Sequence, residues 1–449
     1  MRNNQVLKTY KIGGIHPSEY KLTDKSPVKI LPLPEKVTIL LSQHIGVPAI
    51  PVVSKGDTVK VGQLIAQGRG FVSASIHSSV SGKVVKIDSI PDLTGYKKPA
   101  IVIEVEGDEW EEDIIQSTDL KKDISLSKDE ILEKIRESGI VGLGGAAFPS
   151  HVKLILPHGK NAEALIINGV ECEPYLTSDH RLMLEYGEEM MVGIQILMKV
   201  LNVRKAMIGI ENNKADAVHY LRDISSKFPG IEVYSLKVKY PQGSEKQLIK
   251  ALTGREVPSR KLPIDVGVVV HNASTAYAIY EAVQKNKPLI NRIVTVSGKS
   301  LKNPSNFVVR IGTPIQFLIE AAGGLPENTG KVISGGLMMG KALNSLDVPV
   351  IKGMSGILVL TEDETKRESI EPCIRCSKCL SVCPMGLEPY LLMPLTLDGN
   401  FYRLEKEMVL DCLECGSCSY ICPANRPLLD YIKFGKTEVT KLINERKLV

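Results

Sequence analysis

Hydrophobic and polar positions alternate in different ways along the chain, and each pattern predicts a different kind of module. Short apolar runs punctuated by Gly and Asp fill residues 31–106, which favours a small all-β module. From Ser127 to about residue 285, strand-like runs alternate with helical patterns, which predicts a parallel sheet covered by helices. Residues 291–360 contain two strand patterns, a helix and further strand patterns, typical of a compact α+β unit. The chain is therefore predicted to be a multidomain α/β and α+β protein.

The middle stretch carries the clearest local signals. Ser127 and Glu130 are spaced as a capping box, which predicts that a helix begins there. The strand-like runs read ALIING, KAMIGI, EVYSLKV and VGVVV. Helices are predicted over 181–201, 214–227, 245–253 and 273–285. Ligands of a parallel sheet bind at the carboxyl ends of its strands, so the residues that follow these runs are candidates for a binding site.

The module boundaries follow from the changes of pattern. An irregular arm rich in Gly and Pro precedes the β-rich module, and an acidic, then polar linker follows it. We expect an arm over 1–30, a β-rich module over 31–107, an α/β domain over 127–288, an α+β module over 289–361, a cysteine-rich unit over 366–432 and a basic tail over 433–449 that forms an exposed helix.

Composition excludes several classes of protein. Of the 449 residues, 43% are hydrophobic and 24% are charged, which is ordinary for a globular protein. The net charge of +5 is spread along the chain and only 5% of residues are aromatic, so a nucleic-acid partner is not expected. No run approaches the roughly 18 apolar residues of a membrane helix, and the N-terminus lacks the apolar core of a secretory signal. We therefore expect a chain in the cytoplasm.

Eight of the nine cysteines are concentrated in one short stretch near the C-terminus, which points to metal rather than disulfides in a cytoplasmic protein. They form two groups, EPCIRCSKCLSVCP and DCLECGSCSYICP, that repeat at a distance of 39 residues from Cys373 to Cys412. Each group has the C-x2-C-x2-C-x3-C-P spacing of bacterial two-cluster ferredoxins. The stretch therefore predicts a ferredoxin-like unit with two [4Fe-4S] clusters.

The ferredoxin rule assigns the cysteines in a crossed manner, because the fourth cysteine of each group serves the other cluster. Cluster 1 would be held by Cys373, Cys376, Cys379 and Cys422, and cluster 2 by Cys383, Cys412, Cys415 and Cys418. The alternative is a pair of zinc sites. Zinc ribbons use two C-x2-C pairs separated by a longer loop, and three consecutive cysteines at spacing three do not fit that pattern.

A short Gly-rich loop is the first sign of a cofactor site. The segment GIVGLGGAAFPSHVK places Gly142, Gly144 and Gly145 between two structured segments, where backbone N–H groups can approach a phosphate. A simple turn is the alternative. The loop does not match the Rossmann pattern because position 147 is Ala147, and the GKS at 298–300 is not a Walker loop because the required upstream glycine is absent.

Polar residues follow two of the predicted strands. Glu171 and Glu173 follow the run ALII in INGVECEPY, and their alternative is an ordinary solvated loop. His271 and Asn272 end the strand VVV, and we assign no catalysis to the histidine. A further Gly-Ser helix start occurs in YPQGSEKQLI. Cys172 lies outside the cysteine groups and is not expected to be a ligand.

The stretch GDTVKVGQLIAQGRGFVSASIHSSVSGKVVKI resembles a lipoyl or biotinyl carrier domain. Such domains carry a modified lysine at a hairpin tip. Here the tip at residues 69–75 reads RGFVSAS and has no Lys. We therefore expect a scaffold without a swinging arm.

These segments together resemble a known family. The Gly-rich loop ending in Phe-Pro, N-x-x-E-x-E-P, G-x-E and a strand ending in Asn occur in this order in the flavin-binding subunit of respiratory complex I, the 51-kDa type. With the GGIHP arm, the lipoyl-like module and the paired cysteine groups, residues 10–435 resemble the C-type subunits of Rnf complexes, the membrane-bound ferredoxin:NAD oxidoreductases. The α+β unit then corresponds to an SLBB-like β-grasp module. Leu143 and Ser244 stand where complex I subunits carry Arg and Glu.

The resemblance implies a site for FMN and NAD(H). Phe148 would stack on the adenine of NADH, Glu173 and Glu245 would contact the dinucleotide, and Gly243 would belong to the same site. The implied FMN contacts are Gly142, Gly144, Gly145, Lys153, Asn168, Val170, Glu171 and Asn272.

The resemblance also implies a function. FMN would exchange a hydride with NAD(H), and two [4Fe-4S] clusters would carry single electrons to partner subunits and, through the complex, to and from ferredoxin. The complex would couple this transfer to movement of Na⁺ or H⁺. The chain would be a peripheral subunit on the cytoplasmic face of the membrane and would meet the membrane only through its partners.

Three other functions fit parts of the sequence. A flavin and iron–sulfur cobalamin reductase shares several modules, but the GGIHP arm and the lipoyl-like module favour Rnf. The soluble subunit of the Na⁺-pumping quinone reductase has a similar N-terminal architecture but lacks the two cysteine groups. A non-catalytic iron–sulfur adaptor with a degenerate nucleotide site is the third.

Overall fold

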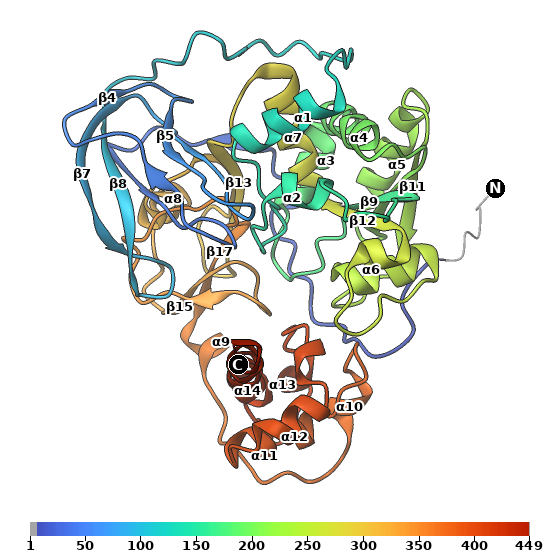
Figure 1. Cartoon of the computed structure of the whole chain (residues 1–449). Helices are drawn as coiled ribbons and strands as arrows, with labels where there is room; N and C mark the ends of the chain where they lie inside the picture. The colour runs from blue at the N-terminus through green and yellow to red at the C-terminus, as the bar shows by residue number, and fades with distance from the viewer. Residues whose placement is uncertain (1–6, 449) are drawn as a thin grey trace.

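The computed structural model describes residues 7–448 and shows a β-rich lobe, an α/β lobe, a second mixed sheet and a helical C-terminal module (Figure 1). Residues 1–6 of the expected arm and Val449 of the expected tail lie outside the described residues. Across residues 7–448, no helix has both the length and the apolar character needed to cross a bilayer.

The β-rich lobe consists of two small antiparallel sheets. The first has the order β2 (Lys36–Leu40), β8 (Lys97–Val105), β7 (Gly82–Pro91) and β4 (Thr58–Val59). The second has the order β3 (Ile50–Pro51), β5 (Leu64–Gln67) and β6 (Ile76–His77). Alternate side chains such as Val37, Ile39, Ile101 and Ile103 are completely buried, as expected for strands with one face on a core.

The α/β lobe is built on a four-stranded parallel sheet. Its order is β11 (Ile231–Leu236), β10 (Ala206–Glu211), β9 (Ala164–Asn168) and β12 (Val268–Asn272). The four strands coincide with the predicted strand-like runs. Those of β9, β10 and β12 lack alternation because both faces of these strands are covered, whereas the edge strand β11 is partly exposed. The helices are α1 (Lys128–Glu137), α2 (Ser150–Leu154), α3 (Ser178–Glu185), α4 (Gly187–Leu201), α5 (Ala215–Ser225), α6 (Glu245–Thr253) and α7 (Ala273–Lys285), with a 3-10 turn η1 (Pro263–Val266). The capping box at Ser127 and Glu130 is present at the start of α1.

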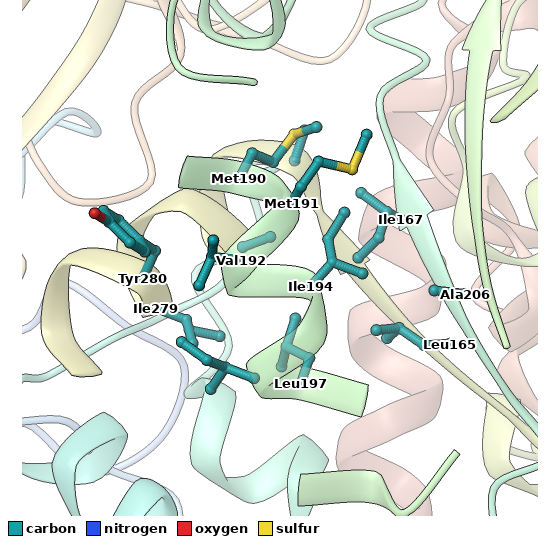
Figure 2. Close-up of a cluster of buried hydrophobic side chains, with 14 of the residues drawn as sticks. Leu165, Ile167, Met190, Met191, Val192, Ile194, Leu197, Ala206, Ile279 and Tyr280 are labelled. Carbon is teal, nitrogen blue, oxygen red and sulfur yellow. The ribbon is translucent and has the colours of Figure 1, made fainter. Parts of the chain in front are cut away.

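The core of this lobe lies between the sheet and the pair α4 and α7. Figure 2 shows Met190, Met191 and Ile194 of α4 between Ile279 of α7 and the sheet residue Ile167. At Gly193 the two helices touch so closely that an added Cβ would lie 1.9 Å from the carbonyl oxygen of Ala276. Only glycine fits there, so this residue sets how close the helices come.

The module after the α/β lobe contains a six-stranded sheet with both parallel and antiparallel strand pairs and one covering helix; it is called the second mixed sheet. Its order is β1 (Lys29–Ile30), β14 (Ser305–Arg310), β13 (Asn291–Ser297), β17 (Gly356–Thr361), β15 (Thr329–Ser334) and β16 (Lys341–Ala342), and the helix is α8 (Ile315–Ala321). The edge strand β1 comes from the N-terminal arm and pairs in parallel with β14. The arm, expected to be irregular throughout, therefore contributes to this sheet.

The C-terminal module is made of short helices and loops. Its helices are α10 (Lys378–Ser381), α11 (Pro389–Leu397), α12 (Phe401–Lys406), α13 (Ser417–Tyr420) and α14 (Leu428–Leu448), with a 3-10 turn η2 (Val409–Asp411). The short helix α9 (Glu362–Thr365) comes before this module and packs against β15 and β17 of the preceding sheet. Figure 1 shows this module below the rest of the chain, with its end marked at α14.

One sequence-based expectation about helices is wrong. The helix expected over 181–201 is two helices, because Tyr186 leaves the helical conformation with φ −128° and ψ 32° and its ring packs against Tyr277. The described part of the basic tail is helical and mostly exposed, as expected. It continues α14 from Leu428, and Val439 within it is buried against the neighbouring helices.

Candidate functional site

The Gly-rich loop forms a tight turn between α1 and α2. The Gly142 N–H donates to the Phe148 carbonyl oxygen at 2.8 Å, and the Leu143 N–H donates to Thr275 Oγ1 at 2.9 Å. Gly144 and Gly145 at the tip are exposed, and Gly145 has φ +107° with open space where a side chain would be. The loop is therefore held at its base, while its tip leaves the backbone free to meet a ligand.

The ends of β9 and β12 lie beside this loop. Asn168 and Asn272 are register partners at the carboxyl ends of the two parallel strands. The Asn168 amide donates to the Gly243 carbonyl oxygen at 2.7 Å. A Cβ on Gly144 would lie 3.4 Å from that of Asn272. The structure thus brings together residues from the Gly-rich loop, both strand ends and the Gly-Ser segment.

Lys153 and Glu245 form an ion pair on the same side of the sheet. Their Nζ and Oε1 atoms are 2.8 Å apart, and about a third of each side chain is exposed. The ammonium also donates to the Val270 carbonyl oxygen at 3.2 Å. A bound anion could therefore draw Lys153 away from Glu245 without exposing a buried charge.

Glu171 has a local partner that sequence patterns do not reveal. Its carboxylate accepts the backbone N–H groups of Asp179 and His180 at 2.8 and 3.1 Å and the Ser178 hydroxyl at 3.2 Å. These are the first groups of α3, whose positive end favours a carboxylate. Glu171 itself has φ +46°, which turns the chain towards the helix. The Glu171 carboxylate therefore caps α3. A ligand that contacts this carboxylate would have to do so while the capping hydrogen bonds remain.

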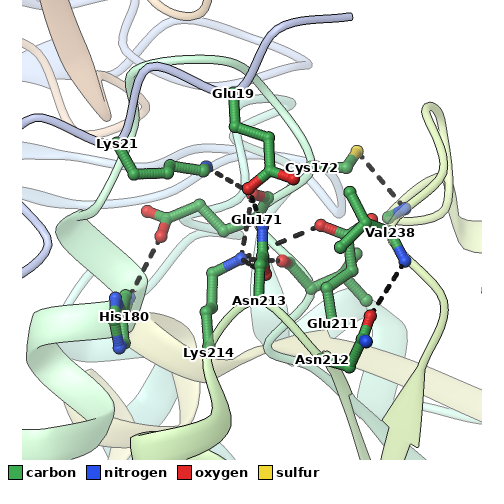
Figure 3. Close-up of polar contacts among 12 residues, drawn as sticks. Glu19, Lys21, Glu171, Cys172, His180, Glu211, Asn212, Asn213, Lys214 and Val238 are labelled. Atoms are coloured by element: carbon green, nitrogen blue, oxygen red, sulfur yellow. Dashed lines mark hydrogen bonds and ion pairs between the residues drawn. The ribbon is translucent and has the colours of Figure 1, made fainter. Parts of the chain in front are cut away.

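Two lysines, half-buried Lys21 and buried Lys214, hold the loop that follows β9 (Figure 3). Lys21 of the N-terminal arm donates to the carbonyl oxygens of Glu171, Glu173 and Leu176 at 2.7 to 2.9 Å. Lys214 donates to the Val170 carbonyl oxygen at 2.8 Å. Burial lowers the pKa of Lys21 to about 8. Two ammonium groups thus donate hydrogen bonds to the carbonyl oxygens of this loop, and these bonds hold the loop in one conformation.

Glu173 reaches a different part of the chain. Its carboxylate accepts the backbone N–H groups of Met338 and Met339 at 2.8 and 3.0 Å, in the loop between β15 and β16. Burial raises the pKa of this carboxyl to about 7, although the two hydrogen bonds oppose the shift. The structure therefore places Glu173 as a link between the α/β lobe and the second mixed sheet.

The structure adds two charged residues that the sequence analysis did not select. Asp179 accepts hydrogen bonds from Asn272 Nδ2 at 2.6 Å and from the Ser274 hydroxyl, and burial together with the charge of Glu171 raises its pKa to about 6. Arg292 donates to the Leu143 carbonyl oxygen at 3.0 Å, and burial lowers its pKa to about 10. A charged residue within the apolar strand run NRIVTVSG was the available signal for Arg292.

Four cysteines line a cavity in the C-terminal module. They are Cys383 from the first group and Cys412, Cys415 and Cys418 from the second, and apolar side chains including Leu392 complete the wall. Backbone N–H groups of Leu387 and Glu414 point at the Cys383 and Cys412 sulfurs at 3.3 and 3.4 Å. This is the set that the crossed assignment requires for cluster 2, and N–H···S contacts suit cluster sulfurs.

The remaining cysteines lie on the outer side of the module. Burial and, to a smaller extent, the nearby Cys422 raise the pKa of the Cys379 thiol, whereas Cys373 and Cys376 are exposed. Burial raises the pKa of Cys412 to about 11 and of Cys418 to about 12. Because iron binds the thiolate, metal loading of the inner cysteines would release protons.

The thiols do not converge on a single ion. Within residues 7–448, no three His, Cys, Asp or Glu side chains come close enough to share one. Zinc would draw four sulfurs to about 2.3 Å from one point. The inner cysteines instead surround a space, which fits a multi-iron cluster better than zinc.

The cysteine-lined cavity adjoins the α/β lobe. The Tyr240 hydroxyl donates to the Cys415 carbonyl oxygen at 2.8 Å, and Gln247 Nε2 donates to the Pro384 carbonyl oxygen at 3.0 Å. The Gly14 N–H of the arm donates to the Val382 carbonyl oxygen at 2.8 Å. Tyr240 lies just before the Gly-Ser segment, so the candidate cofactor site and the inner cysteines are joined through one short stretch of chain.

Comparison with known proteins places these features in a family. Residues 135–281 match the Nuo51 FMN-binding domain, residues 9–108 the RnfC barrel sandwich hybrid domain and residues 293–342 the SLBB domain. Over 438 residues the chain is 50% identical to the C-type subunit of the proton-translocating ferredoxin:NAD(+) oxidoreductase complex of Clostridium ljungdahlii, covering 96% of this chain and 94% of that protein. The chain belongs to the RnfC family.

Two more RnfC relatives cover nearly the whole chain. The C-type subunit of the Na(+)-translocating ferredoxin:NAD(+) oxidoreductase complex of Acetobacterium woodii is 45% identical, covering 96% of this chain and 97% of that protein. The C-type subunit of the ion-translocating oxidoreductase complex of Rhodobacter capsulatus is 43% identical, covering 97% of this chain and 84% of that protein. The RnfC family membership that the sequence motifs predicted is therefore confirmed.

A solved structure shares the fold of much of this RnfC chain. The crystal structure of an NAD+-reducing [NiFe]-hydrogenase in the H2-reduced state matches with a TM-score of 0.50 and 17% identity, covering 70% of this chain and 60% of that one. The match to the Nuo51 FMN-binding domain spans the Gly-rich loop, both strand ends and α6. The twelve cofactor residues chosen from the sequence lie in or directly beside these elements.

Proposed function

We propose that this chain is the NADH- and FMN-binding electron-transfer subunit of an ion-translocating ferredoxin:NAD⁺ oxidoreductase complex. The chain exchanges a hydride between NAD(H) and FMN and passes single electrons through two [4Fe-4S] clusters to partner subunits. One observation carries the proposal. The cavity lined by four cysteines is joined through Tyr240 to the lobe that contains the Gly-rich loop and both strand ends.

The FMN would be held at the carboxyl edge of the parallel sheet. The tip glycines Gly144 and Gly145 supply exposed backbone, and Lys153 supplies a cation for a phosphate. Asn168 and Asn272 end the two central strands with side-chain amides. FMN, when bound, converts between two-electron exchange with a nicotinamide and one-electron exchange with iron–sulfur clusters.

The chain's own residues fix this site before any ligand arrives. Lys21 and Lys214 hold the carbonyls of the loop after β9, and Glu171 caps α3 from the same loop. These hydrogen bonds already hold the loop in place, so the loop needs little rearrangement on binding. Phe148, Glu173, Gly243 and Glu245 complete the set proposed to meet the dinucleotide.

The inner and outer cysteines have different places in the proposed path. Cys383, Cys412, Cys415 and Cys418 would hold cluster 2, next to the α/β lobe. Cys373, Cys376, Cys379 and Cys422 would hold cluster 1, on the outer side. The order from FMN to cluster 2 to cluster 1 follows from this placement.

The other components of the path belong to partner subunits. Relatives are subunits of complexes named proton-translocating and Na(+)-translocating ferredoxin:NAD(+) oxidoreductases. By analogy, we propose that this chain is a peripheral subunit on the cytoplasmic face and that it exchanges electrons with ferredoxin through the complex. The ion pathway would lie in membrane partners.

Anaerobic reconstitution with FMN, iron and sulfide tests the proposal. On mixing with NADH in a stopped-flow spectrometer, we expect flavin absorbance to bleach first and cluster absorbance to fall afterwards. Gly145→Val should abolish flavin binding and leave the clusters, because it blocks the loop tip and strains a residue at φ +107°. Gly56→Val is the matched control, since Gly56 has φ +101° and open space in the β-rich lobe.

Two results would contradict the proposal. Unaltered protein that contains clusters but takes up no flavin and shows no bleaching with NADH would support the non-catalytic adaptor instead. Loss of flavin in both glycine variants would show that backbone strain, rather than the loop tip, governs binding.

A further inference from the structure

The hairpin tip of the β-rich lobe is tied to the Gly-rich loop. Residues 68–75 join β5 to β6 and form this tip. The Val72 carbonyl oxygen accepts the Val47 N–H at 3.0 Å, which fastens the tip to the segment between β2 and β3. In the same segment, the Ile45 N–H donates to the Ala147 carbonyl oxygen at 3.2 Å, just after the exposed tip of the Gly-rich loop. The β-rich lobe therefore reaches the edge of the candidate cofactor site.

Backbone contacts hold the hairpin tip beside the start of α2. A Cβ on Gly46 would lie 2.1 Å from the Val72 carbonyl oxygen, so the two segments touch along their backbones. Burial lowers the pKa of His151 in α2, and the nearby Phe71 backbone partly opposes this shift. His151 follows Phe148 by three residues. Phe71 and Phe148 therefore belong to segments that meet at the start of α2.

Three large apolar side chains are exposed on this part of the β-rich lobe. Phe71 is 62% exposed, Ile45 53% and Val47 54%, and these three residues are here called the apolar rim. Phe71 stands in the hairpin tip where a lipoyl-type carrier would bear its modified lysine. Large apolar side chains exposed together mark binding sites. Because hydrogen bonds fix the backbone beneath it, the apolar rim is a preformed wall for a ligand.

The charge of the surrounding segments limits what this ligand can be. Residues 42–53 and 62–75 contain no carboxylate, and Arg69 is their one lysine or arginine. Arg69 is exposed and has no ion pair in the part of the chain that the structure describes. The surface is therefore apolar with one free cation, which suits a ligand that combines a flat apolar ring with phosphate groups.

We propose that the apolar rim is a wall of the dinucleotide site and that the Phe71 ring packs against the adenine of NAD(H). The inference deepens the proposed function and rests on it, because it assumes that the dinucleotide binds at the Gly-rich loop. It makes the dinucleotide site a joint product of the α/β lobe and the β-rich lobe. The contact forms no covalent bond and transfers no electron.

The state of the two phenylalanine rings favours this ligand. The family resemblance assigns Phe148 to the adenine, and Phe148 is half-buried. Within residues 7–448, neither the Phe148 ring nor the Phe71 ring packs against another aromatic ring. Both rings are therefore available to a base, and any base can stack on an aromatic side chain through its π face.

A partner subunit is the alternative occupant of the apolar rim. Protein interfaces surround an apolar centre with a polar border. Residues 42–53 and 62–75 supply only Arg69 as a charged side chain on such a border, apart from the buried His44. The rim also lies directly beside the Gly-rich loop rather than on a separate face. Both observations favour the dinucleotide.

Binding of ADP-ribose to the FMN-reconstituted chain tests the proposal, because this probe contains the adenine and the pyrophosphate but no nicotinamide. In anaerobic isothermal titration, Phe71→Ala should bind it about tenfold more weakly, which corresponds to a loss of about 1.4 kcal/mol. Phe71→Tyr keeps an aromatic ring and should recover most of the affinity. Tyr96→Ala is the matched control and should bind normally, since Tyr96 is 73% exposed in the turn between β7 and β8 of the same lobe.

Flavin bleaching by two reductants separates the adenine contact from damage to the flavin site. Phe71→Ala should need about tenfold more NADH for the half-maximal rate. With reduced nicotinamide mononucleotide, which lacks the adenosine, the same variant should show no such loss.

Three outcomes would overturn the proposal. Equal affinity of Phe71→Ala and the unaltered chain for ADP-ribose would leave the apolar rim as a surface for a partner subunit. Equal losses with NADH and with the mononucleotide would show that the change does not depend on the adenine. If NADH bleaches no flavin in the unaltered chain, the proposed function fails and the adenine contact fails with it, whereas either of the first two outcomes with normal bleaching overturns the adenine contact alone.

Discussion

Glu173 shows how one side chain can connect distant parts of the chain. It follows β9 in the sequence, but its carboxylate accepts two backbone N–H groups from residues 338 and 339. Met338 in turn packs with Ile15, Tyr240 and Cys415. The residue chosen from sequence as a dinucleotide contact is therefore also a support for the wall next to the inner cysteines.

Replacing Glu173 by Ala should slow NADH-driven flavin bleaching about tenfold, because two backbone N–H groups lose their acceptor and the wall beside the candidate site loosens. Stopped-flow absorbance measures the rate, and the cluster absorbance should remain. Glu104→Ala, exposed on β8, is the control. An unchanged rate, or loss of cluster absorbance, would show that the role assigned to Glu173 is wrong.

Among the elements, α3 depends most clearly on a residue outside it. The side chain of its N-cap residue, Thr177, accepts no capping hydrogen bond. The Glu171 carboxylate fills that role from the preceding loop. Helix α7 is capped by its own N-cap residue, because the Asn272 side chain accepts the Thr275 N–H. The bounds of α6 and α7 coincide with those predicted from periodicity.

Glu171→Ala should destabilise the start of α3 by about 1 to 2 kcal/mol, the usual effect of losing an N-terminal cap. Hydrogen exchange of the Asp179 and His180 amides should become faster. Glu171→Gln keeps a carbonyl acceptor and should restore part of the protection. Amides of α4, which has its own contacts, serve as the internal control, and unchanged exchange in α3 would exclude the capping role.

On the scale of the whole molecule, one buried lysine joins three modules. Lys352, in the turn before β17 of the second mixed sheet, donates to the Ser75 carbonyl oxygen of the β-rich lobe at 2.7 Å and to the Gly139 carbonyl oxygen of the α/β lobe at 2.8 Å. Burial lowers its pKa from 10.5 to about 7. The junction of these modules therefore contains an ammonium group that can lose its proton near neutral pH.

Stability should rise with pH above neutrality because of this lysine. Between pH 7 and pH 10.5 the unfolded chain binds more protons at Lys352 than the native chain does, so the free energy of unfolding increases with pH. Below pH 7 both states are protonated and the effect is constant. His44 and His77 face the same group, but their pKa values are lowered from 6.5, so they titrate below this window.

Lys352→Met should reduce the rise in the urea midpoint between pH 7 and higher pH, whereas Lys97→Met, at an exposed site, should not. The two variants are compared by the pH dependence of the unfolding transition. An equal slope in Lys352→Met and the unaltered protein would contradict the assignment.

The inner cavity gives a second prediction at this scale. Cys383→Ala should remove about half of the bound iron, because it takes one ligand from a four-cysteine cluster and leaves the other cluster intact. Cys172→Ala is the matched control, since Cys172 is a half-buried thiol outside that cavity. Iron analysis after anaerobic reconstitution measures both. Unchanged iron in Cys383→Ala would contradict the crossed assignment.

The sequence by itself determined features that depend on neighbours along the chain. Periodicity identified the parallel strands, the ends of α6 and α7 and the start of α1, and cysteine spacing identified the paired groups. The motifs predicted the RnfC family, which the relatives confirm. Each of these signals is local, because backbone hydrogen bonds in helices and the ligand spacing of a cluster involve residues only a few positions apart.

Only the tertiary structure decided what each polar group meets. Lys21 reaches carbonyl oxygens more than a hundred residues away, Arg292 reaches the Gly-rich loop from another sheet, and Tyr186 breaks a helix that periodicity would continue. A buried charge is tolerated only where partners compensate for lost water, and those partners come from distant segments. No pattern along the chain identifies these distant partners. The hydrogen bonds of Glu171 to the start of α3 and of Glu173 to residues 338 and 339 could therefore be found only from the fold.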